Sequence, residues 1–257
     1  MNDKQYNELE GLRRSDLWVL NKTPLHFKYN LDNPQPQTEA LLFGSAVHKY
    51  ILEPLDFYNE YAVAPQVDRR TKEGKEIYNN FLQETTEKGL TVISQEQLEQ
   101  IKDMAAVLKQ DQLVIDLLMG AKYEQVYTWT DPETQVPLKV KADIITQFEG
   151  KTYIVDYKTT SSCEYKDFYR SMRKYGYDFQ AGMYSEVIEN NLLESVEFAF
   201  IAQEKTPPYA YRVFWVDKEV VRTGKGKLHN LLRLYKACAD LDQWKGYEPE
   251  ELLEEVY

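Results

Sequence analysis

VPLKVKADIITQFEGKTYIVDYKTT, residues 136–160, is the stretch that decides the fold of this 257-residue chain. It contains two runs of apolar and β-branched residues that are separated by the dipeptide Glu149-Gly150. Two such runs around a short glycine-containing turn predict an antiparallel pair of strands. The preceding run YEQVYTWT, residues 123–130, leads into the turn sequence DPET and predicts one more strand. We therefore expect an antiparallel meander of three strands here.

The sequence before this meander has the features of helices. Thr38 can cap a helix that runs through EALLFGSAVHKYILE. Ser94 and Gln97 form a capping-box pattern, and Asp111 can cap another short helix. After the meander we expect two helices, two strands and a long final helix, at 164–172, 178–189, 196–203, 209–216 and about 218–239. Gly224 and Gly226 are candidate break points in that last helix.

This order of elements indicates a mixed α/β (α+β) fold in which helices flank a central mixed sheet. No internal repeat, low-complexity tract or long linker divides the chain, so we predict a single domain over residues 1–257. Its parts would be a mainly helical portion over 1–120, the sheet core with the active site over 121–216, and C-terminal helices over 217–257.

The composition argues for a cytoplasmic protein that is not associated with a membrane. No segment reaches the roughly 20 apolar residues that span a bilayer. The polar start MNDKQYNELEGLRR lacks the apolar centre of a signal peptide. The two cysteines, Cys163 and Cys238, form neither a CxxC pair nor a disulfide framework. A reducing compartment fits these features.

The net charge of −11 argues against nucleic-acid binding, because phosphate neutralisation dominates affinity for DNA. A DNA-binding protein of this charge would need a local concentration of basic residues. The segment 218–236 holds six basic residues and one acid, Glu219. It is either a DNA-binding surface or a solvated helix face. Two other basic groups are candidates for the DNA path: Arg69, Arg70, Lys72 and Lys75, and Arg170, Arg173 and Lys174.

Asp156 and Lys158 point to the same side of their strand, because side chains alternate along a strand. The pattern alone is that of a surface ion pair. However, Ile154 and Val155 indicate a buried strand, and charges are rarely buried without partners or a metal. Asp143 lies on the neighbouring strand, about 4.8 Å away in the sheet. Two aspartates at this spacing can share Mg²⁺ or Mn²⁺, which prefer carboxylate oxygens.

His48 shares a helix stripe with Leu41, Gly44 and Ile51. A histidine on an apolar helix face is commonly a core residue. Gly44, one turn earlier, would instead let this face approach another element closely. As a metal ligand, His48 would widen the choice of ion towards Mn²⁺. The residues alone leave both interpretations open.

Four segments, FGSAVHKYILEP, VKADIIT, IVDYKTT and FQAGMYSE, carry a resemblance to a known family. In this order they resemble the motifs of PD-(D/E)XK nucleases, most of all the phage and prophage RecE-type exonucleases (exodeoxyribonuclease VIII-like proteins). The pattern G-x-x-x-H, D, D-x-K and Q-x-x-x-Y is filled here by Gly44, His48, Asp143, Asp156, Lys158, Gln180 and Tyr184. The usual PD is AD here, because Ala142 precedes Asp143. The resemblance covers residues 40 to 204.

The resemblance implies a restriction-endonuclease-like core and assigns roles to the motif residues. His48, Asp143 and Asp156 would bind the metal, joined by the main-chain carbonyl of Tyr157. Lys158 would hold or activate the attacking water and steady the charge on the phosphate.

Two residues on the following helix and one acid on the first strand complete the candidate set. Gln180 and Tyr184 lie one helical turn apart, so both can face the site. Supporting the contact between helix and sheet is their alternative role. Glu124 is an additional acid that would lie outside the metal ligands.

By the same resemblance, the chain would be a Mg²⁺- or Mn²⁺-dependent 5′–3′ DNA exonuclease. It would degrade linear double-stranded DNA from an end and leave 3′ single-stranded tails for phage-type recombination. The family also implies a homo-oligomer and a partner single-strand annealing protein. The alternatives are a PD-(D/E)XK endonuclease and a non-catalytic DNA-binding protein of the same fold. An iron–sulfur nuclease is excluded, because its cluster needs four thiolates and the chain has two cysteines.

Overall fold

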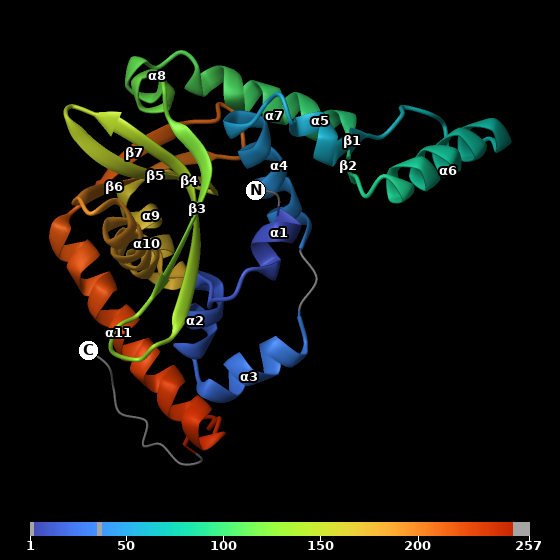
Figure 1. Ribbon diagram of the computed structural model, residues 1–257. Coiled ribbons are helices and arrows are strands. Elements are labelled where there is room, and N and C mark those ends of the chain that lie inside the picture. Colours follow the sequence, from blue (N-terminus) through green and yellow to red (C-terminus); the bar gives the residue numbers. More distant parts are fainter. Residues whose placement is uncertain (1–2, 35–37, 249–257) are drawn as a thin grey trace, which may run out of the picture.

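A mixed five-stranded sheet forms the centre of the structure, a computed structural model that describes residues 3–34 and 38–248 (Figure 1). In spatial order its strands are β3 (Lys122–Thr130), β4 (Pro137–Phe148), β5 (Lys151–Thr160), β6 (Val196–Glu204) and β7 (Tyr211–Val216). Strands β3, β4 and β5 are antiparallel neighbours, β6 is parallel to β5, and β7 is antiparallel to β6. The predicted meander and the mixed sheet are confirmed.

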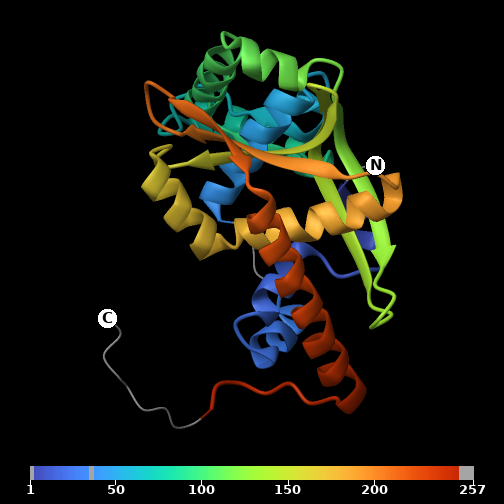
Figure 2. The same ribbon diagram turned by 90° about the vertical axis from the view of Figure 1, so that its left-hand side faces the viewer.

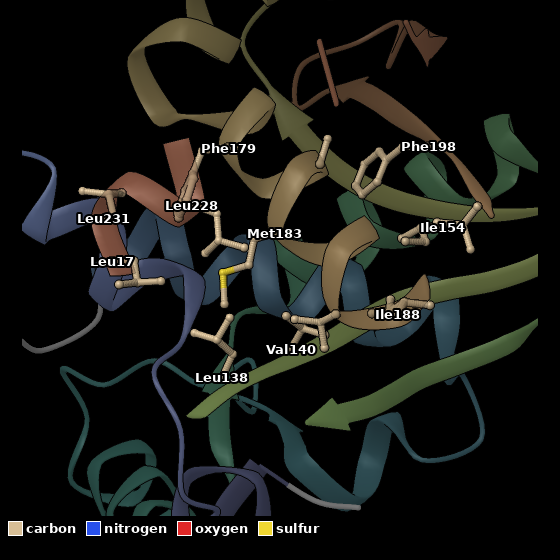
Figure 3. Close-up of a cluster of buried hydrophobic side chains, with 14 of the residues drawn as sticks. Leu17, Leu138, Val140, Ile154, Phe179, Met183, Ile188, Phe198, Leu228 and Leu231 are labelled. Atoms are coloured by element: carbon tan, nitrogen blue, oxygen red, sulfur yellow. The ribbon is translucent and has the colours of Figure 1, made fainter. Parts of the chain in front are cut away.

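One face of the sheet is covered by α2 (Arg14–Leu20), α9 (Tyr165–Tyr175), α10 (Tyr177–Leu192) and α11 (Lys218–Leu241). Val140, Ile154 and Phe198 point to this face from three neighbouring strands. They pack in one cluster with Met183 and Ile188 of α10 (Figure 3). Eight of the 16 residues of α10 are buried, so this helix lies inside the domain.

The opposite face is covered by α4 (Glu39–Leu52), α7 (Gln95–Leu108) and α8 (Gln112–Leu118). Ile144 and Val155 point to this side and pack in one cluster with Val47, Ile101 and Leu117 of the three helices. Both faces of β5 are therefore buried. This explains why its sequence carries consecutive apolar residues instead of a strict alternation.

The predicted caps of the N-terminal helices are confirmed. The Thr38 hydroxyl accepts a hydrogen bond in the first turn of α4, and Asp111 does the same for α8. Ser94 and Gln97 form the capping box of α7. The remaining helices are α1 (Asp3–Glu8), α3 (Pro24–Asp32), α5 (Phe57–Glu60) and α6 (Lys72–Glu87). In the described part of the chain, no helix combines the length and the apolar sequence that a membrane crossing needs.

The mainly helical N-terminal portion also contains a small sheet that the sequence analysis does not predict. Strands β1 (Tyr61–Val63) and β2 (Thr91–Ile93) pair in parallel. Three residues are too few for a strand periodicity to be recognised. The segment between these strands contains α6, which extends away from the body of the molecule (Figure 1).

The C-terminal part differs from the prediction at the two glycines of its long helix. Helix α11 continues through Gly224 and Gly226, so the predicted break is wrong. A Cβ on Gly182 of α10 would lie 2.2 Å from the carbonyl carbon of Gly224. Gly182 and Gly224 therefore allow α10 and α11 to cross closely, and Gly224 does not end α11. C-terminal helices were predicted over 217–257; the described residues up to 248 contain α11, and 249–257 lie outside the described part.

We predict that Gly224→Ala destabilises the protein. The added Cβ would lie 2.1 Å from the carbonyl oxygen of Asp178, and overpacking typically costs about 1–3 kcal/mol. Gly226→Ala is the matched control, because this exposed position of the same helix has no atom within 4 Å of an added Cβ. Alanine is favoured over glycine in a helix by about 1 kcal/mol. Urea denaturation should show a lower free energy of unfolding only for Gly224→Ala, and equal values would contradict the close crossing.

Candidate active site and metal centre

The candidate site lies where β4 and β5 separate. The two strands are paired up to Ile144 and Val155 and no further, although both continue. Asp143 and Asp156 are the first residues beyond this last pair. The Asp143 carboxylate accepts a hydrogen bond from the main-chain N–H of Tyr157 at 3.0 Å. The separation of the strands thus makes room for two acidic side chains in the middle of the sheet.

His48, Glu124 and Asp143 form a cluster whose potential ligand atoms all lie within 4.8 Å of one another. The His48 Nε2 is 2.7 Å from Asp143 Oδ2, and its Nδ1 is 3.3 Å from Glu124 Oε1. Glu124 lies opposite Asp143, because the pairs on either side of it align β3 with β4. Its φ of +51° is uncommon for a non-glycine residue. The structure therefore brings Glu124 among the candidate ligands, whereas the sequence analysis places it outside them.

Asp156 lies beside this cluster and is 2% exposed. Its Oδ2 is 2.5 Å from Lys158 Nζ, and Gln180 Nε2 of α10 donates a hydrogen bond to its Oδ1. Tyr184 follows one turn later on α10. Burial raises the pKa of Tyr184, and the charges of Asp156 and Asp143 raise it further. Lys158 of the D-x-K motif and Gln180 of the Q-x-x-x-Y motif therefore both contact Asp156.

The acidic side chains of the site depend on positive partners. Burial raises the pKa of Asp156 to about 6, and the charge of Asp143 adds to this shift while Lys158 opposes it. Burial also acts to raise the pKa of Asp143, but His48 and Lys158 outweigh it, and that pKa is lowered. For His48, burial acts to lower the pKa, but Asp143 and Glu124 raise it on balance. A divalent cation would neutralise this concentration of negative charge.

The donor atoms present fit Mg²⁺ or Mn²⁺. Glu124 has a buried carboxylate oxygen, Oε1, that accepts no hydrogen bond within the described residues and lies 3.3 Å from His48 Nδ1, and its Oε2 is 2.6 Å from Lys141 Nζ. Carboxylate oxygens are the ligands that both ions prefer, and a single imidazole is compatible with Mn²⁺. His48, Asp143 and Asp156, with Glu124 added, would hold the metal.

His48 lies on the cleft side of α4. Leu41, Gly44 and His48 line a cleft, whereas Val47 of the same helix is fully buried in the core. A Cβ on Gly44 would lie 3.4 Å from Thr159 Oγ1, an ordinary contact distance, so α4 lies next to β5 at this position. This position favours the ligand interpretation of His48 over the core interpretation.

The cleft over these groups has a volume of about 980 Å³. Asp143 and Gln180 lie on its wall. Five basic residues also line it: Arg14, Lys49, Lys141, Lys158 and Lys205. Five acids line it as well: Glu53, Asp56, Glu60, Glu124 and Asp143. Lys49, Lys141 and Lys158 form ion pairs with acids, so charges of both signs face the cleft.

Arg14 of α2 is a cleft residue that sequence reasoning missed. Its guanidinium donates hydrogen bonds to the carbonyl of Gly176, at 3.0 Å, and to that of Tyr175. Burial lowers the pKa of Arg14, and the nearby Tyr184 and Asp156 oppose the shift. Its Nε is buried without a hydrogen-bond partner among residues 3–34 and 38–248. No motif surrounds Arg14 in the sequence, so only the tertiary structure reveals it.

Comparison with known proteins agrees with this geometry. The family described as PDDEXK-like domain of unknown function (DUF3799) matches residues 15–252. The chain belongs to this family. The PD-(D/E)XK part of the resemblance is thereby confirmed, and the match does not test the RecE-type part.

A solved structure shares the fold of this chain. This structure, named "Putative exonuclease" from Eubacterium rectale, matches with a TM-score of 0.65 and 17% identity, over 100% of this chain and 96% of that one. At this identity the likeness shows the fold alone. A second, SSO0001, matches with a TM-score of 0.37 and 13% identity over 89% and 81% of the two chains, which is too distant to support a conclusion. Among curated proteins, none matches the chain.

The basic residues of α11, the first candidate for a DNA-binding segment, all have acidic partners. Lys225 is 3.2 Å from Glu186 of α10, and Lys227 is 2.5 Å from Asp178. The other pairs are Lys218 with Glu197, Arg222 with Glu219, Arg233 with Glu133, and Lys236 with Asp240. Several of these pairs tie α11 to α10 and to the β3–β4 turn. The charge of the basic residues in this segment is therefore compensated locally.

A buried hydrogen-bond network holds Tyr157, the central residue of the D-x-K motif. Its hydroxyl donates to Gln203 Oε1 at 2.7 Å. Gln203 is fully buried, and its Nε2 donates to the carbonyls of Met104 and Tyr209 at 3.0 and 3.1 Å. Because the N–H of Tyr157 also binds Asp143, the network fixes the strand that carries the site.

We predict that Mn²⁺ raises the melting temperature of the protein. A ligand at 100 times its Kd stabilises the native state by about 2.7 kcal/mol, which corresponds to about 5–10 °C for a chain of this size. Asp143→Asn should abolish the shift and Glu124→Gln should reduce it, because each removes a ligand charge. Asp32→Asn is the control, because this exposed acid lies on α3. The melting temperatures are measured by differential scanning fluorimetry. If Mn²⁺ raises the melting temperature of Asp143→Asn as much as that of the wild type, the proposed metal site is wrong.

A further prediction concerns Tyr157→Phe, which leaves the amide oxygen of Gln203 unpaired in the core. The expected loss in the free energy of unfolding is about 1–3 kcal/mol. Tyr58→Phe should have no effect, because Tyr58 is 58% exposed. Chemical denaturation of the two variants checks this, and equal stability would show that the network contributes nothing.

Proposed function

We propose that this chain is a Mg²⁺- or Mn²⁺-dependent deoxyribonuclease. The observation that carries the proposal is that Asp143 and Lys158 line a cleft where β4 and β5 separate, with Asp156 buried beside them and paired with Lys158. Buried acids are costly unless cations compensate them. A non-catalytic DNA-binding protein of this fold would have no chemical need for the three residues together.

The side chains suit distinct roles in phosphodiester hydrolysis. When bound, the metal supplies a nucleophilic water near neutral pH and offsets charge on the scissile phosphate. Lys158 stays protonated, because the charges of Asp156 and Asp143 outweigh the effect of burial and raise its pKa. Its ammonium group would orient the attacking water and stabilise negative charge on the phosphate.

Other cleft residues would hold the metal-binding groups and the substrate in place. Gln180 fixes one oxygen of Asp156, and the main-chain carbonyl of Tyr157 would join the ligands, as the resemblance implies. Arg14 places a half-buried guanidinium at the cleft, where a phosphate of the DNA backbone would find a charged donor. Tyr184 would support Gln180 from the same helix.

The proposal extends to the digestion of linear double-stranded DNA from an end, in the 5′–3′ direction, with 3′ tails left for phage-type recombination. Its support is the RecE-type resemblance of the motifs and the printed name of the Eubacterium rectale structure, and no distance in the site bears on it. The homo-oligomer and the single-strand annealing partner also stay predictions of the resemblance. An endonuclease of the same fold is the alternative.

We predict that Lys158→Ala lowers the cleavage rate by about 10²–10³, the usual effect of losing one group that stabilises the transition state. Asp156→Asn should be at least as damaging, because it removes a metal ligand. Lys227→Gln is the matched control, because this lysine pairs with Asp178 outside the cleft. The measurement is nucleotide release from linear duplex DNA in Mg²⁺ or Mn²⁺, with EDTA as the blank. Wild-type rates for Asp156→Asn would refute the site.

The same assay separates the two modes of cutting. Linear duplex should be digested, and covalently closed circular duplex should stay intact, because an exonuclease needs an end. Equal rates on both substrates would favour the endonuclease alternative. No cleavage of either would favour a DNA-binding protein without activity.

A further inference from the structure

Helix α9 presents a face of exposed aromatic and basic side chains. Tyr165 and Tyr169, one turn apart, are 61% and 43% exposed. Their rings lie 14° from parallel, with 6.2 Å between centroids. Helical spacing continues this stripe to Arg173 and places a second, basic stripe beside it. Together these residues form the α9 surface: Tyr165, Lys166, Tyr169, Arg170, Arg173 and Lys174.

Most of the basic side chains of the α9 surface lack an acidic partner. Arg170 is 2.7 Å from Asp167. Within the described ranges, Lys166, Arg173 and Lys174 form no ion pair. The basic residues of α11, by contrast, all have acidic partners. On a chain with a net charge of −11, uncompensated cations on one helix are a local attraction for phosphate.

The α9 surface adjoins the active-site cleft. Helix α9 follows β5, which carries Asp156 and Lys158, and it ends at Tyr175. Tyr175 and Tyr177 line the cleft, and their rings stack with 5.9 Å between centroids. Figure 2 shows α9 at the outer edge of the molecule, leading directly into α10. Aromatic side chains therefore occur both in the cleft and along the helix that leads outward from it.

We propose that the α9 surface binds single-stranded DNA. Aromatic rings beside cations suit the binding of a single strand, because bases stack on the rings and the cations form ion pairs with the phosphates. A paired duplex hides the faces of its bases, so it would use only the cations. This inference rests on the proposed nuclease function, because digestion of one strand of a duplex releases the other strand next to the cleft.

The test is the binding of a fluorescent oligothymidylate and of a closed hairpin duplex, measured by anisotropy in Mg²⁺. The full chain carries Asp156→Asn throughout to prevent cleavage. Adding Tyr165→Ala and Tyr169→Ala should raise the Kd for the single strand about tenfold or more, since stacking contributes about 1–3 kcal/mol per base. The Kd for the duplex should not change. Thermal melting of each variant verifies that the helix still folds.

A second pair of changes separates the basic residues from the rings. Arg173→Gln with Lys174→Gln should weaken the binding of both ligands. It should also reduce the salt slope for the single strand by about 0.7 for each phosphate that the protein no longer neutralises.

Matched controls lie elsewhere on the surface. Tyr29→Ala removes a tyrosine of α3 that is 58% exposed, and Lys218→Gln with Arg222→Gln removes two paired cations of α11. These variants should bind like the parent protein.

Unchanged single-strand affinity in the Tyr165→Ala, Tyr169→Ala protein would overturn the inference, as would equally weakened binding in the control variants. Binding is measured without cleavage, so the result is independent of the nuclease assay. If the α9 variants bind single-stranded DNA poorly and the wild-type protein cuts no DNA, the results support the α9 binding surface and refute the nuclease function. If the wild-type protein cuts DNA and the α9 variants bind single-stranded DNA normally, the results support the nuclease function and refute the α9 binding surface.

Discussion

Two aspartates held side by side where β4 and β5 separate impose the constraint on which the rest of the site depends. Burying a carboxylate costs several kcal/mol unless charges and hydrogen bonds compensate it. The Asp143 carboxylate pairs with His48 and accepts a hydrogen bond from the N–H of Tyr157. The Asp156 carboxylate pairs with Lys158 and accepts a hydrogen bond from Gln180. These partners come from α4, β5 and α10. Both layers of helices must therefore pack on the sheet before the acids are compensated, which links the site to the whole fold.

The parts of the structure that sequence analysis predicted are those that local chemistry determines. Helix caps at Thr38, Ser94 and Asp111 depend on a few neighbouring residues, and they are confirmed. The short turn between β4 and β5 sets their register, which aligns Asp143 with Asp156, although the strand pairing ends one residue earlier. The β3–β4 turn sets the position of Glu124 in the same way. The position of Glu124 opposite Asp143 could thus have been inferred from the sequence, but the family pattern has no acid at the position of Glu124.

The features that sequence analysis missed depend on contacts between distant segments. Arg14 reaches the cleft through a carbonyl 162 positions away. Helix propensity alone predicts that Gly224 breaks a helix. In the structure Gly182 of α10 crosses α11 at Gly224, so a residue without a side chain is required there for packing. The acids that pair with Lys225 and Lys227 lie on another helix, so local charge counting overestimated the free charge of α11.

Net charge and DNA binding are compatible here because the two act over different distances. The charge of −11 describes the whole surface, and at 0.15 M salt its field is screened beyond about 8 Å. Interactions within that distance depend on local groups, which are the charged residues of both signs in the cleft and the unpaired side chains of α9. The carboxylates of the site would repel a phosphate at close range until a divalent ion neutralises them. The same ion that supports hydrolysis would thus also allow the backbone to enter, so substrate binding and metal binding are coupled by electrostatics.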